Sequence, residues 1–509
     1  MKRVVDAIAR DPVRALWWVL GFSLVFKLLL AAVLPLTQDE AYFTMWGEFP
    51  ALGYSEHPPM IGWILWPILL IGKTRFLVRL PAVLATVIIG WGIYRLLSDR
   101  GQKQAAWAAT LFLLSPLNLL YVIITTDTPL IFFSFWSIFA YYRAHRSGRW
   151  TWYVVAGLFL SFAFLSKYFA VLLGFAYLVH FLLAPKNSRR SIGMLLLYLS
   201  VLPAGLLDIY WNYHHSWLQI NSNLFYRNAG DGPNFVTPLV YAATVLYLLF
   251  PAGLLEWWRG RGEFTARLKK HDAMVFAVLY LAPMTVFALL SIAKKIGLHW
   301  LLSFCVLSYL ISWAMIHRDE MARAARFTVR FSLAHIVLVV VVLSIPVQVF
   351  QGSGNYASIV MSKYHRELAA KLAPYTHDRK LGADGYGLAC QLSFYNPGFF
   401  SHFARGTIHG RQDDVITDWR EWAGRDVMIF HRREPKIEQY EGLFDQMRVE
   451  TIEVRGQTFY LLLGDRLDFD AFRDRILMPI RDRFYQVPEW LPMEQCFFRA
   501  RYFPEGPPR

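Results

Sequence analysis

Apolar residues fill the chain almost without interruption from residue 16 to residue 350, and charged residues return at ordinary density after residue 351. A helix that crosses a lipid bilayer needs about 20 mostly apolar residues. The apolar runs therefore predict a polytopic α-helical membrane protein with about eleven spans. These runs lie near residues 16–36, 79–97, 105–123, 129–143, 152–165, 168–184, 192–210, 237–257, 272–292, 298–316 and 331–350.

The last third of the chain has a different pattern. Ser358–Leu372 is amphipathic with a helical period, and Asp426–His431 and Thr458–Leu463 have the composition of short strands. We therefore expect two domains, a membrane domain over residues 1–350 and a mixed α/β domain over residues 351–509.

Lysine and arginine gather in alternate connections between the expected spans. The intervening connections are poor in both, and neither residue occurs between Thr37 and Gly72 or between Ile123 and Pro129. Because basic loops stay in the cytoplasm, the N-terminus is expected there. An odd number of spans then places residues 351–509 on the outer side of the membrane.

Composition supports the membrane assignment. The chain is 56% hydrophobic and 17% charged, whereas soluble domains carry about 25% charged residues. A net charge of +15 is compatible with nucleic acid, anionic lipid or membrane topology. The excess lies in short loops, which favours topology, so we expect no nucleic-acid partner. Cys305 is expected in apolar packing, and Cys390 and Cys496 as two free thiols or, outside the cytoplasm, as a disulfide.

The first outer loop carries Asp39, Glu40, Glu56 and His57 without any lysine or arginine. Ionisable residues inside or beside membrane spans are costly and often functional. A surface loop with a helix cap at Thr37 or Asp39 is the alternative. The many aromatic neighbours favour a packed loop, so we predict a functional acidic pair.

Further ionisable residues follow on the same side. Asp127, in Thr125–Pro129, is either functional or the start of the next helix, where proline and a carboxylate are both favoured. Lys167 lies between two short apolar runs and either extends to the interface or neutralises a phosphate. Two later outer connections contain Arg227 and His299, and an interfacial hydrogen bond is the alternative role for each histidine. The sequence has no Gly-rich nucleotide-binding loop, so an energy source or donor is expected in the membrane.

The outer side carries five short motifs in order, which are Asp39–Tyr42, Gly53–Pro59, Thr126–Leu130, Leu165–Tyr168 and Trp211–Trp217. In order and spacing they resemble the motifs of bacterial GT-C glycosyltransferases of the family 39/83 type. This family includes relatives of the protein O-mannosyltransferases and of the aminoarabinose transferase that modifies lipid A. Gly382–Arg425 is similar to the outer domain of bacterial members.

The resemblance implies a sugar donor linked to polyprenyl phosphate and held by membrane lipids, with the sugar on the outer side. An attacking hydroxyl needs a general base, and a carboxylate is suitable. By resemblance Asp39 is the base, and Asp127 is a second catalytic carboxylate that orients the acceptor or the base. Glu40 is assigned to the catalytic group as well. The leaving group is a lipid phosphate, which needs cations or hydrogen-bond donors. Direct displacement predicts inversion at the anomeric carbon.

The same resemblance implies substrate-binding residues. Lys167, His57 and Arg227 are expected to bind the phosphate, and Glu56 to shape the site. In the aminoarabinose-transferase branch a lysine takes the place of His57, so a neutral imidazole here could instead bind a divalent metal ion together with Glu56. Tyr54 and His299 complete the substrate-binding set.

Two other classes of protein compete with the enzyme. A transporter or flippase would place charges along a pathway at mid-bilayer, whereas these gather at one face. A catalytically silent assembly partner is the second alternative. For an enzyme the acceptor remains open between lipid A or another lipopolysaccharide component, a surface glycan and a protein. The family implies a multi-pass protein of the bacterial inner membrane with a periplasmic C-terminal domain.

Overall fold

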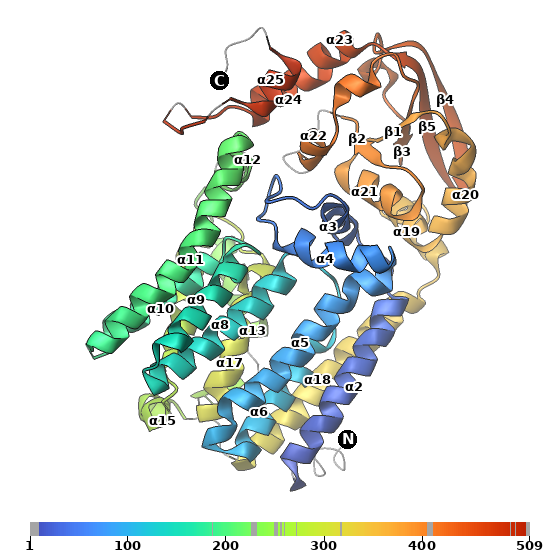
Figure 1. Cartoon of the computed structure of the whole chain (residues 1–509). Coiled ribbons are helices and arrows are strands. Elements are labelled where there is room, and N and C mark those ends of the chain that lie inside the picture. The colour runs from blue at the N-terminus through green and yellow to red at the C-terminus, as the bar shows by residue number, and fades with distance from the viewer. Residues whose placement is uncertain are drawn as a thin grey trace. The chain divides into compact units, whose positions relative to one another are not determined.

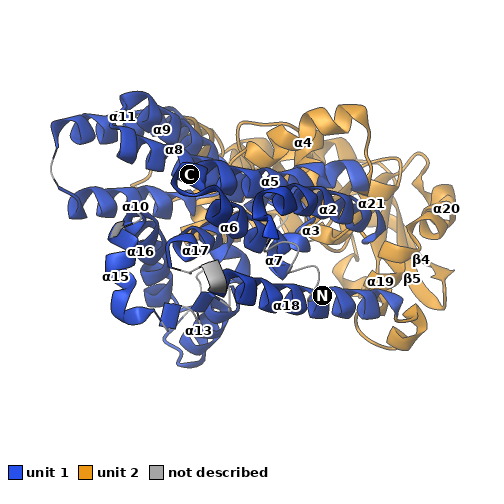
Figure 2. Ribbon diagram, turned by 90° about the horizontal axis from the view of Figure 1, so that it is seen from below, with its two compact units in different colours: residues 1–34, 76–206, 230–344 blue, residues 35–75, 207–229, 345–509 orange. Residues whose placement is uncertain are grey.

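The chain folds into two compact units, and it enters each of them three times (Figure 2). Unit 1 comprises residues 1–34, 76–206 and 230–344, and unit 2 comprises residues 35–75, 207–229 and 345–509. Unit 2 therefore takes two segments from the first 350 residues. The computed structural model describes residues 10–185, 187–224, 232–248, 253–254, 257–258, 260–270, 272–315, 318–404, 411–488, 490–493 and 495–504.

Unit 1 is helical (Figure 1). Local signals in the sequence set several helix ends. The Asp11 side chain accepts a hydrogen bond from the Arg14 N–H at the start of α2, and Pro12 occupies its first position. Gly148 ends α8 with φ +64°, a conformation that glycine adopts without strain. The helices are α2 (Pro12–Val33), α5 (Arg75–Leu97), α6 (Gln102–Leu114), α7 (Pro116–Leu119), α8 (Asp127–Ser147), α9 (Trp150–Phe164), α10 (Ala170–Leu183), α11 (Ser188–His214), α13 (Val236–Leu248), α15 (Phe264–Lys270), α16 (Met274–Leu290), α17 (Leu302–Met315) and α18 (Arg318–Ser344).

Each apolar run of the sequence contains a helix. Within the described part of the chain, five helices are long and apolar enough to cross a membrane, or six if one bent pair is a single span. The predicted membrane protein is confirmed, and the number of eleven spans stays a prediction. The five are Pro12–Val33, Arg75–Arg100, Ser188–His214, Leu298–Met315 and Glu320–Ser344.

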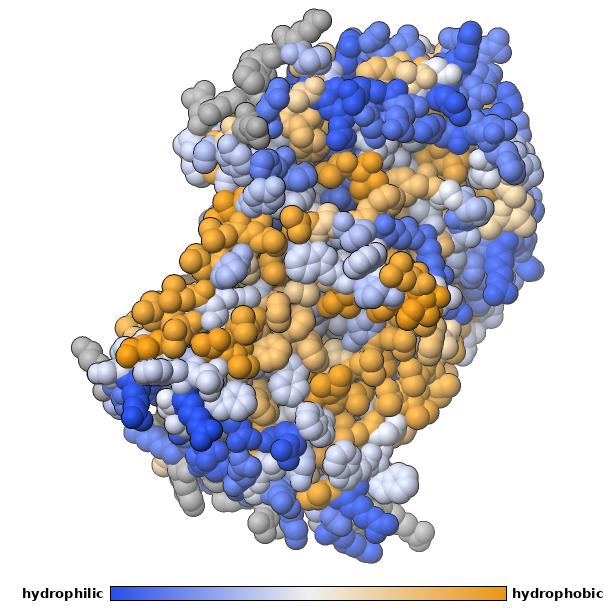
Figure 3. Space-filling view, in the orientation of Figure 1, coloured by the Kyte–Doolittle hydropathy of each residue, from blue (hydrophilic) through white to orange (hydrophobic). Residues whose placement is uncertain are grey.

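Apolar side chains point outward along these helices. Figure 3 shows them over α2, α5 and α11, and Trp18, Leu206 and Val341 are each more than half exposed. Such a surface is costly in water and suits a lipid environment.

Lys27 and Arg79 are buried among the helices of unit 1. Lys27 donates to the Tyr121 carbonyl at 2.9 Å and to the Thr86 hydroxyl. Arg79 donates to the carbonyls of Ala31 at 3.0 Å and Leu34 at 2.8 Å. The last carbonyls of a helix lack intrahelical partners, so the guanidinium of Arg79 satisfies the end of α2. Both cations therefore have a structural role.

Unit 2 contains a five-stranded sheet with the order β2-β1-β3-β5-β4. β1 pairs in parallel with β2 and β3, whereas β5 pairs antiparallel with β3 and β4. The predicted strands are confirmed as β3 and β5, and with them the C-terminal α/β domain. The strands are β1 (Lys380–Ala383), β2 (Phe400–His402), β3 (Val427–His431), β4 (Phe444–Val454) and β5 (Gln457–Leu467).

The central strand β3 is buried on both faces. Val427 and Ile429 pack into one hydrophobic core, and Met428 and Phe430 into another on the opposite face. A strand covered on both sides is a continuous apolar run, which explains why its sequence was recognisable.

Helices cover both faces of the sheet (Figure 1). The helix predicted over Ser358–Leu372 is wrong in one respect, because it is two helices that meet at Tyr364 with φ −113° and ψ 30°. The helices of unit 2 are α3 (Gln38–Glu48), α4 (Met60–Ile71), α12 (Leu218–Leu224), α19 (Tyr356–Lys363), α20 (His365–Thr376), α21 (Tyr386–Tyr395), α22 (Gln412–Ile416), α23 (Phe469–Phe472), α24 (Met478–Phe484) and α25 (Phe497–Tyr502).

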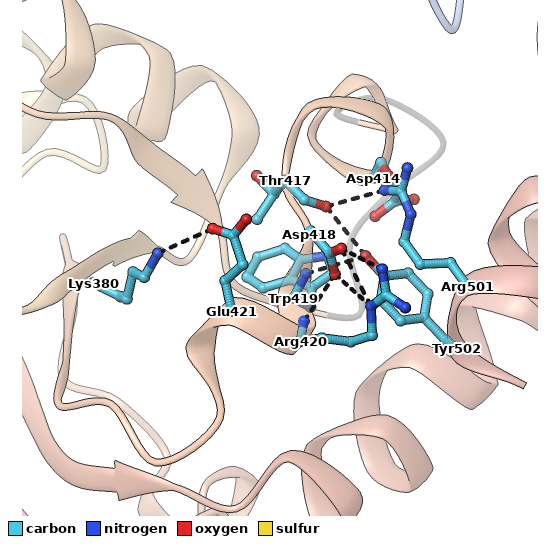
Figure 4. A network of polar contacts seen from close by, with 9 residues as sticks. All are labelled: Lys380, Asp414, Thr417, Asp418, Trp419, Arg420, Glu421, Arg501 and Tyr502. Atoms are coloured by element: carbon cyan, nitrogen blue, oxygen red, sulfur yellow. Dashed lines mark hydrogen bonds and ion pairs between the residues drawn. The ribbon is translucent and has the colours of Figure 1, made fainter.

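Polar contacts connect the C-terminal helix α25 to α22 and to the segment that follows α22 (Figure 4). The Trp419 N–H donates to the Tyr502 hydroxyl at 3.1 Å, and that hydroxyl donates to the Thr417 carbonyl at 3.1 Å. Arg501 donates to the Asp414 carbonyl at 3.3 Å. All three cysteines are free and buried, so the expectation of two free thiols in this part of the chain holds.

Candidate active site

The first acidic motif begins helix α3. The Thr37 N–H and hydroxyl donate to the Glu40 carboxylate at 3.0 and 3.2 Å, and the Glu40 N–H donates to the Thr37 hydroxyl at 3.2 Å. This reciprocal pair is a capping box. Glu40 is fully buried, whereas Asp39 is exposed in the same first turn. The cap explains Glu40 structurally, and the role of the exposed Asp39 as the base stays a prediction.

Tyr54 anchors the loop that follows α3. Its ring stacks on Trp46 with centroids 4.4 Å apart, and its hydroxyl donates to the Trp46 carbonyl at 2.7 Å. The Tyr54 N–H also donates to the His57 carbonyl at 3.0 Å. Tyr54 is fully buried, so in this conformation it holds the loop in place, and a substrate contact stays a prediction.

Glu56 lies against α3. The Tyr42 hydroxyl donates to Glu56 Oε1 at 3.2 Å, and both side chains are buried. Burial, followed by the charge of Glu56, raises the pKa of Tyr42 well above its usual value. The phenol therefore keeps its proton at neutral pH and acts as a fixed donor to the Glu56 carboxylate.

Two amides of α12 hold the backbone of the same loop. Gln219 Nε2 donates to the carbonyls of Tyr54 at 2.8 Å and His57 at 2.9 Å. Asn223 Nδ2 donates to the Glu56 carbonyl at 3.0 Å. Sequence reasoning missed both amides. Their spacing of four residues, which places them on one face of a helix, was the available signal.

Asp127 and Lys167 form a buried ion pair in unit 1. Lys167 Nζ lies 2.7 Å from Asp127 Oδ1, and the two side chains are 9% and 7% exposed. Asp127 is also the first residue of α8, where its N–H donates to the Thr125 hydroxyl at 3.2 Å. Asp127 therefore does start a helix, as the alternative predicted, and its carboxylate also pairs with Lys167 from the next motif.

An aromatic cluster adjoins this pair. Lys167 Nζ lies 5.3 Å from the ring centre of Phe169, whose ring contacts Trp300 with centroids 4.8 Å apart. Lys294 Nζ lies 5.5 Å from the ring centre of Trp300. His299, beside Trp300, is exposed. Unit 1 thus gathers two lysines and a histidine around two aromatic rings, a set of donors suited to an anion.

The predicted site residues are shared between the two units. Unit 2 holds Asp39, Glu40, Tyr54, Glu56 and His57, and unit 1 holds Asp127, Lys167 and His299. Arg227 lies outside the described residues.

The predicted metal pair has a limited donor set. Within the part of the chain that the structure describes, no group of three or more His, Cys, Asp or Glu side chains lies close enough to hold a metal ion. Glu56 and His57 would supply two donors, whereas protein metal sites commonly supply three or more. The role of a metal stays a prediction.

Two comparisons with known proteins bear on this site. Residues 56–211 match a protein family described as dolichyl-phosphate-mannose-protein mannosyltransferase. Among solved structures, the chain is similar to the crystal structure of ArnT from Cupriavidus metallidurans bound to undecaprenyl phosphate. That similarity has a TM-score of 0.56 and 15% identity, and it covers 87% of this chain and 97% of the other. No curated protein sequence matches the chain.

The motifs, the helical fold with its C-terminal sheet and these comparisons agree on one class. The family match over residues 56–211 and the structural similarity support a GT-C glycosyltransferase of the family 39/83 type, the class that the ordered motifs predicted. The matched segment begins at Glu56 and includes Asp127 and Lys167, whereas Asp39 and Glu40 precede it.

Proposed function

We propose that this protein moves a sugar from a polyprenyl-phosphate donor to a cell-envelope acceptor on the outer face of the inner membrane. The observation that carries the proposal is the buried pair of Asp127 and Lys167, which lies within the segment matched to the mannosyltransferase family. The similar ArnT structure, which holds undecaprenyl phosphate, supports a donor of this type.

The proposed transfer is a single displacement in which the acceptor, the base and the phosphate-binding cations each have one role. The acceptor hydroxyl attacks the anomeric carbon, a new C–O bond forms, and the bond from that carbon to the lipid phosphate breaks. Asp39, which is exposed at the start of α3, accepts the hydroxyl proton as general base. The phosphate leaves with the bonding electrons, and cations stabilise the charge it gains. A single displacement of this kind inverts the anomeric centre.

Lys167 is the proposed cation for the phosphate, and Asp127 holds it in position. A lysine that extends into a partly apolar site is otherwise free to adopt many rotamers, which costs about 2 kcal/mol when it is fixed. The short contact with Asp127 orients the ammonium before the donor binds. Lys294 and His299 lie next to the same aromatic cluster as further donors.

Lipid A, another lipopolysaccharide component or a surface glycan is our proposed class of acceptor. The resemblance of the motifs to those of the aminoarabinose transferase that modifies lipid A favours an acceptor of this class. A protein acceptor is the second candidate, because the matched family is described as transferring mannose to protein. A flippase is less favoured, since Asp39 and His57 lie outside the five candidate membrane spans.

The test is transfer in membranes that contain the wild-type chain or Asp39→Asn. Envelope glycolipids and glycoproteins would be compared by mass spectrometry with and without the protein. We expect the substitution to abolish a mass increase of one sugar residue while expression and thermal unfolding stay unchanged. Unchanged transfer by Asp39→Asn would contradict the base assignment, and no mass change with the wild type would contradict sugar transfer itself.

A further inference from the structure

Unit 2 contains a cavity whose lining residues do not include the loop that carries Glu56. Its volume is about 790 Å³. Four separate pieces of unit 2 form its walls: the connection from α4 to α5, the junction of α19 and α20, the end of α21 and the turn between β4 and β5. The lining residues are Lys73, Thr74, Arg75, Lys363, Tyr364, His365, Arg366, Glu367, Phe394, Tyr395 and Arg455.

The lining is strongly basic. It includes five lysine or arginine side chains and a single carboxylate, Glu367. Arg455 Nε lies 2.9 Å from that carboxylate, and Lys73 pairs with Glu48 from α3. Within the described residues, Arg75, Lys363 and Arg366 form no ion pair. Three positive charges therefore share this cavity without a protein counter-charge.

Aromatic contacts fix the shape of the cavity. His365 stacks on Tyr395 with ring centroids 3.9 Å apart, and the Arg455 guanidinium lies 4.7 Å from the ring centre of Tyr364. The β4–β5 turn has two residues, Arg455 at φ +52° and Gly456 at φ +75°, which is the geometry of a tight hairpin turn. The tight turn thus fixes the backbone position of Arg455 at the wall of the cavity.

The positive charges in the cavity also affect the pKa of His365, one of the lining residues. The pKa of His365 is lowered, first by burial and then by the charges of Arg75 and Arg366. His365 also contacts the Ser362 carbonyl through Nδ1 at 3.2 Å. A neutral imidazole in this wall leaves the three cations as the dominant charges, and a bound anion would relieve their mutual repulsion.

The chain around Arg75 indicates where such an anion would come from. Arg75 is the first residue of the candidate span Arg75–Arg100. The preceding helix α4 is apolar, and Leu70 and Ile71 at its end are more than 70% exposed. A basic side chain between an exposed apolar helix end and a membrane span is placed at the level of lipid head groups.

We propose that this cavity binds the phosphate group of an anionic lipid through Arg75, Lys363 and Arg366. Guanidinium and ammonium groups that line the same cavity can bind a phosphate by charge-assisted hydrogen bonds. Inorganic phosphate has the same chemistry, and the apolar surface of α4 favours the lipid source. This site does not depend on the proposed sugar transfer.

The test uses the purified full-length protein in detergent and its binding to dioctanoyl phosphatidic acid, dioctanoyl phosphatidylcholine and inorganic phosphate. We expect phosphatidic acid to bind about tenfold or more tightly than phosphatidylcholine, and Arg75→Gln/Lys363→Gln/Arg366→Gln to remove that preference. The matched control is Arg420→Gln/Arg448→Gln/Arg466→Gln, which changes the net charge equally at exposed positions outside the cavity.

The outcomes separate the possibilities. Loss of the preference in the cavity variant, with the control unchanged, supports the site. Equal loss in both variants indicates general electrostatics and overturns it, as does an unchanged cavity variant. Inorganic phosphate that binds as tightly as phosphatidic acid overturns the lipid source. If the triple variant unfolds at a lower temperature than the wild type, the single variant Arg366→Gln replaces it, with an expected weakening of about threefold or more.

Discussion

Lys167 Nζ lies 2.7 Å from Asp127 Oδ1, and the sequence separates these residues by 40 positions. Breaking a buried pair by removing one partner leaves an unpaired buried charge and costs about 3–5 kcal/mol. We expect Asp127→Asn and Lys167→Gln each to lower the unfolding temperature and to abolish sugar transfer.

The double variant Asp127→Asn/Lys167→Gln distinguishes a pair from two independent residues. Its unfolding temperature should lie above the value expected from adding the two single effects, because it leaves no unpaired charge. Transfer should remain absent. Additive destabilisation in thermal unfolding would contradict the coupling between the two side chains.

Tyr42→Phe removes the phenol that donates to Glu56. A buried carboxylate that loses a donor costs about 1–3 kcal/mol, so the variant should unfold at a lower temperature and transfer sugar more slowly. The matched control is Tyr210→Phe at an exposed ring. Equal behaviour of the two variants would show that the hydroxyl contributes nothing at Glu56.

Gly62 provides a steric test of the loop. A Cβ atom at Gly62 would lie 1.9 Å from the Tyr54 hydroxyl oxygen and 2.6 Å from Cζ, and Tyr54 is fixed by its stacking on Trp46. Gly62→Ala should therefore displace the loop and reduce both stability and transfer. Gly21→Ala, where a Cβ meets nothing within 4 Å, should be neutral or slightly stabilising.

Asp413 predicts a pH dependence of stability. Burial raises the pKa of Asp413 to about 7, and the charge of Asp414 acts in the same direction. The folded state then holds a proton that the unfolded state releases near pH 4, so this group's contribution is fully present at low pH and is lost as the pH rises to about 7. The unfolding temperature of Asp413→Asn should fall less between about pH 5 and pH 8 than that of the wild type. A wild-type curve that rises over this range, with an identical curve for the variant, would exclude this assignment.

The sequence predicted the elements whose causes are local. β3 was recognisable because Val427–Phe430 is a continuous apolar run, and the start of α3 because Thr37 and Glu40 have the spacing of a cap. The break between α19 and α20 was not, because Tyr364 is neither proline nor glycine.

The candidate site was predictable as a set of residues and not as a set of contacts. The motifs identified Asp127 and Lys167 separately, with the lysine assigned to a phosphate. Their direct pairing depends on how α8 and the chain after α9 pack, which no local pattern contains. The support of the Glu56 loop by Gln219 and Asn223 likewise joins positions more than 160 residues apart.

The three-segment composition of unit 2 has a consequence for biosynthesis. Helix α3 packs against α21, and the Tyr42 ring contacts Tyr386 with centroids 5.2 Å apart. During translation α3 leaves the ribosome hundreds of residues before α21. Until α21 is made, the aromatic face of α3 is therefore exposed or is covered by another factor. A chain that stops before residue 386 would never bury that face, and quality-control proteases would meet it as an unfinished protein.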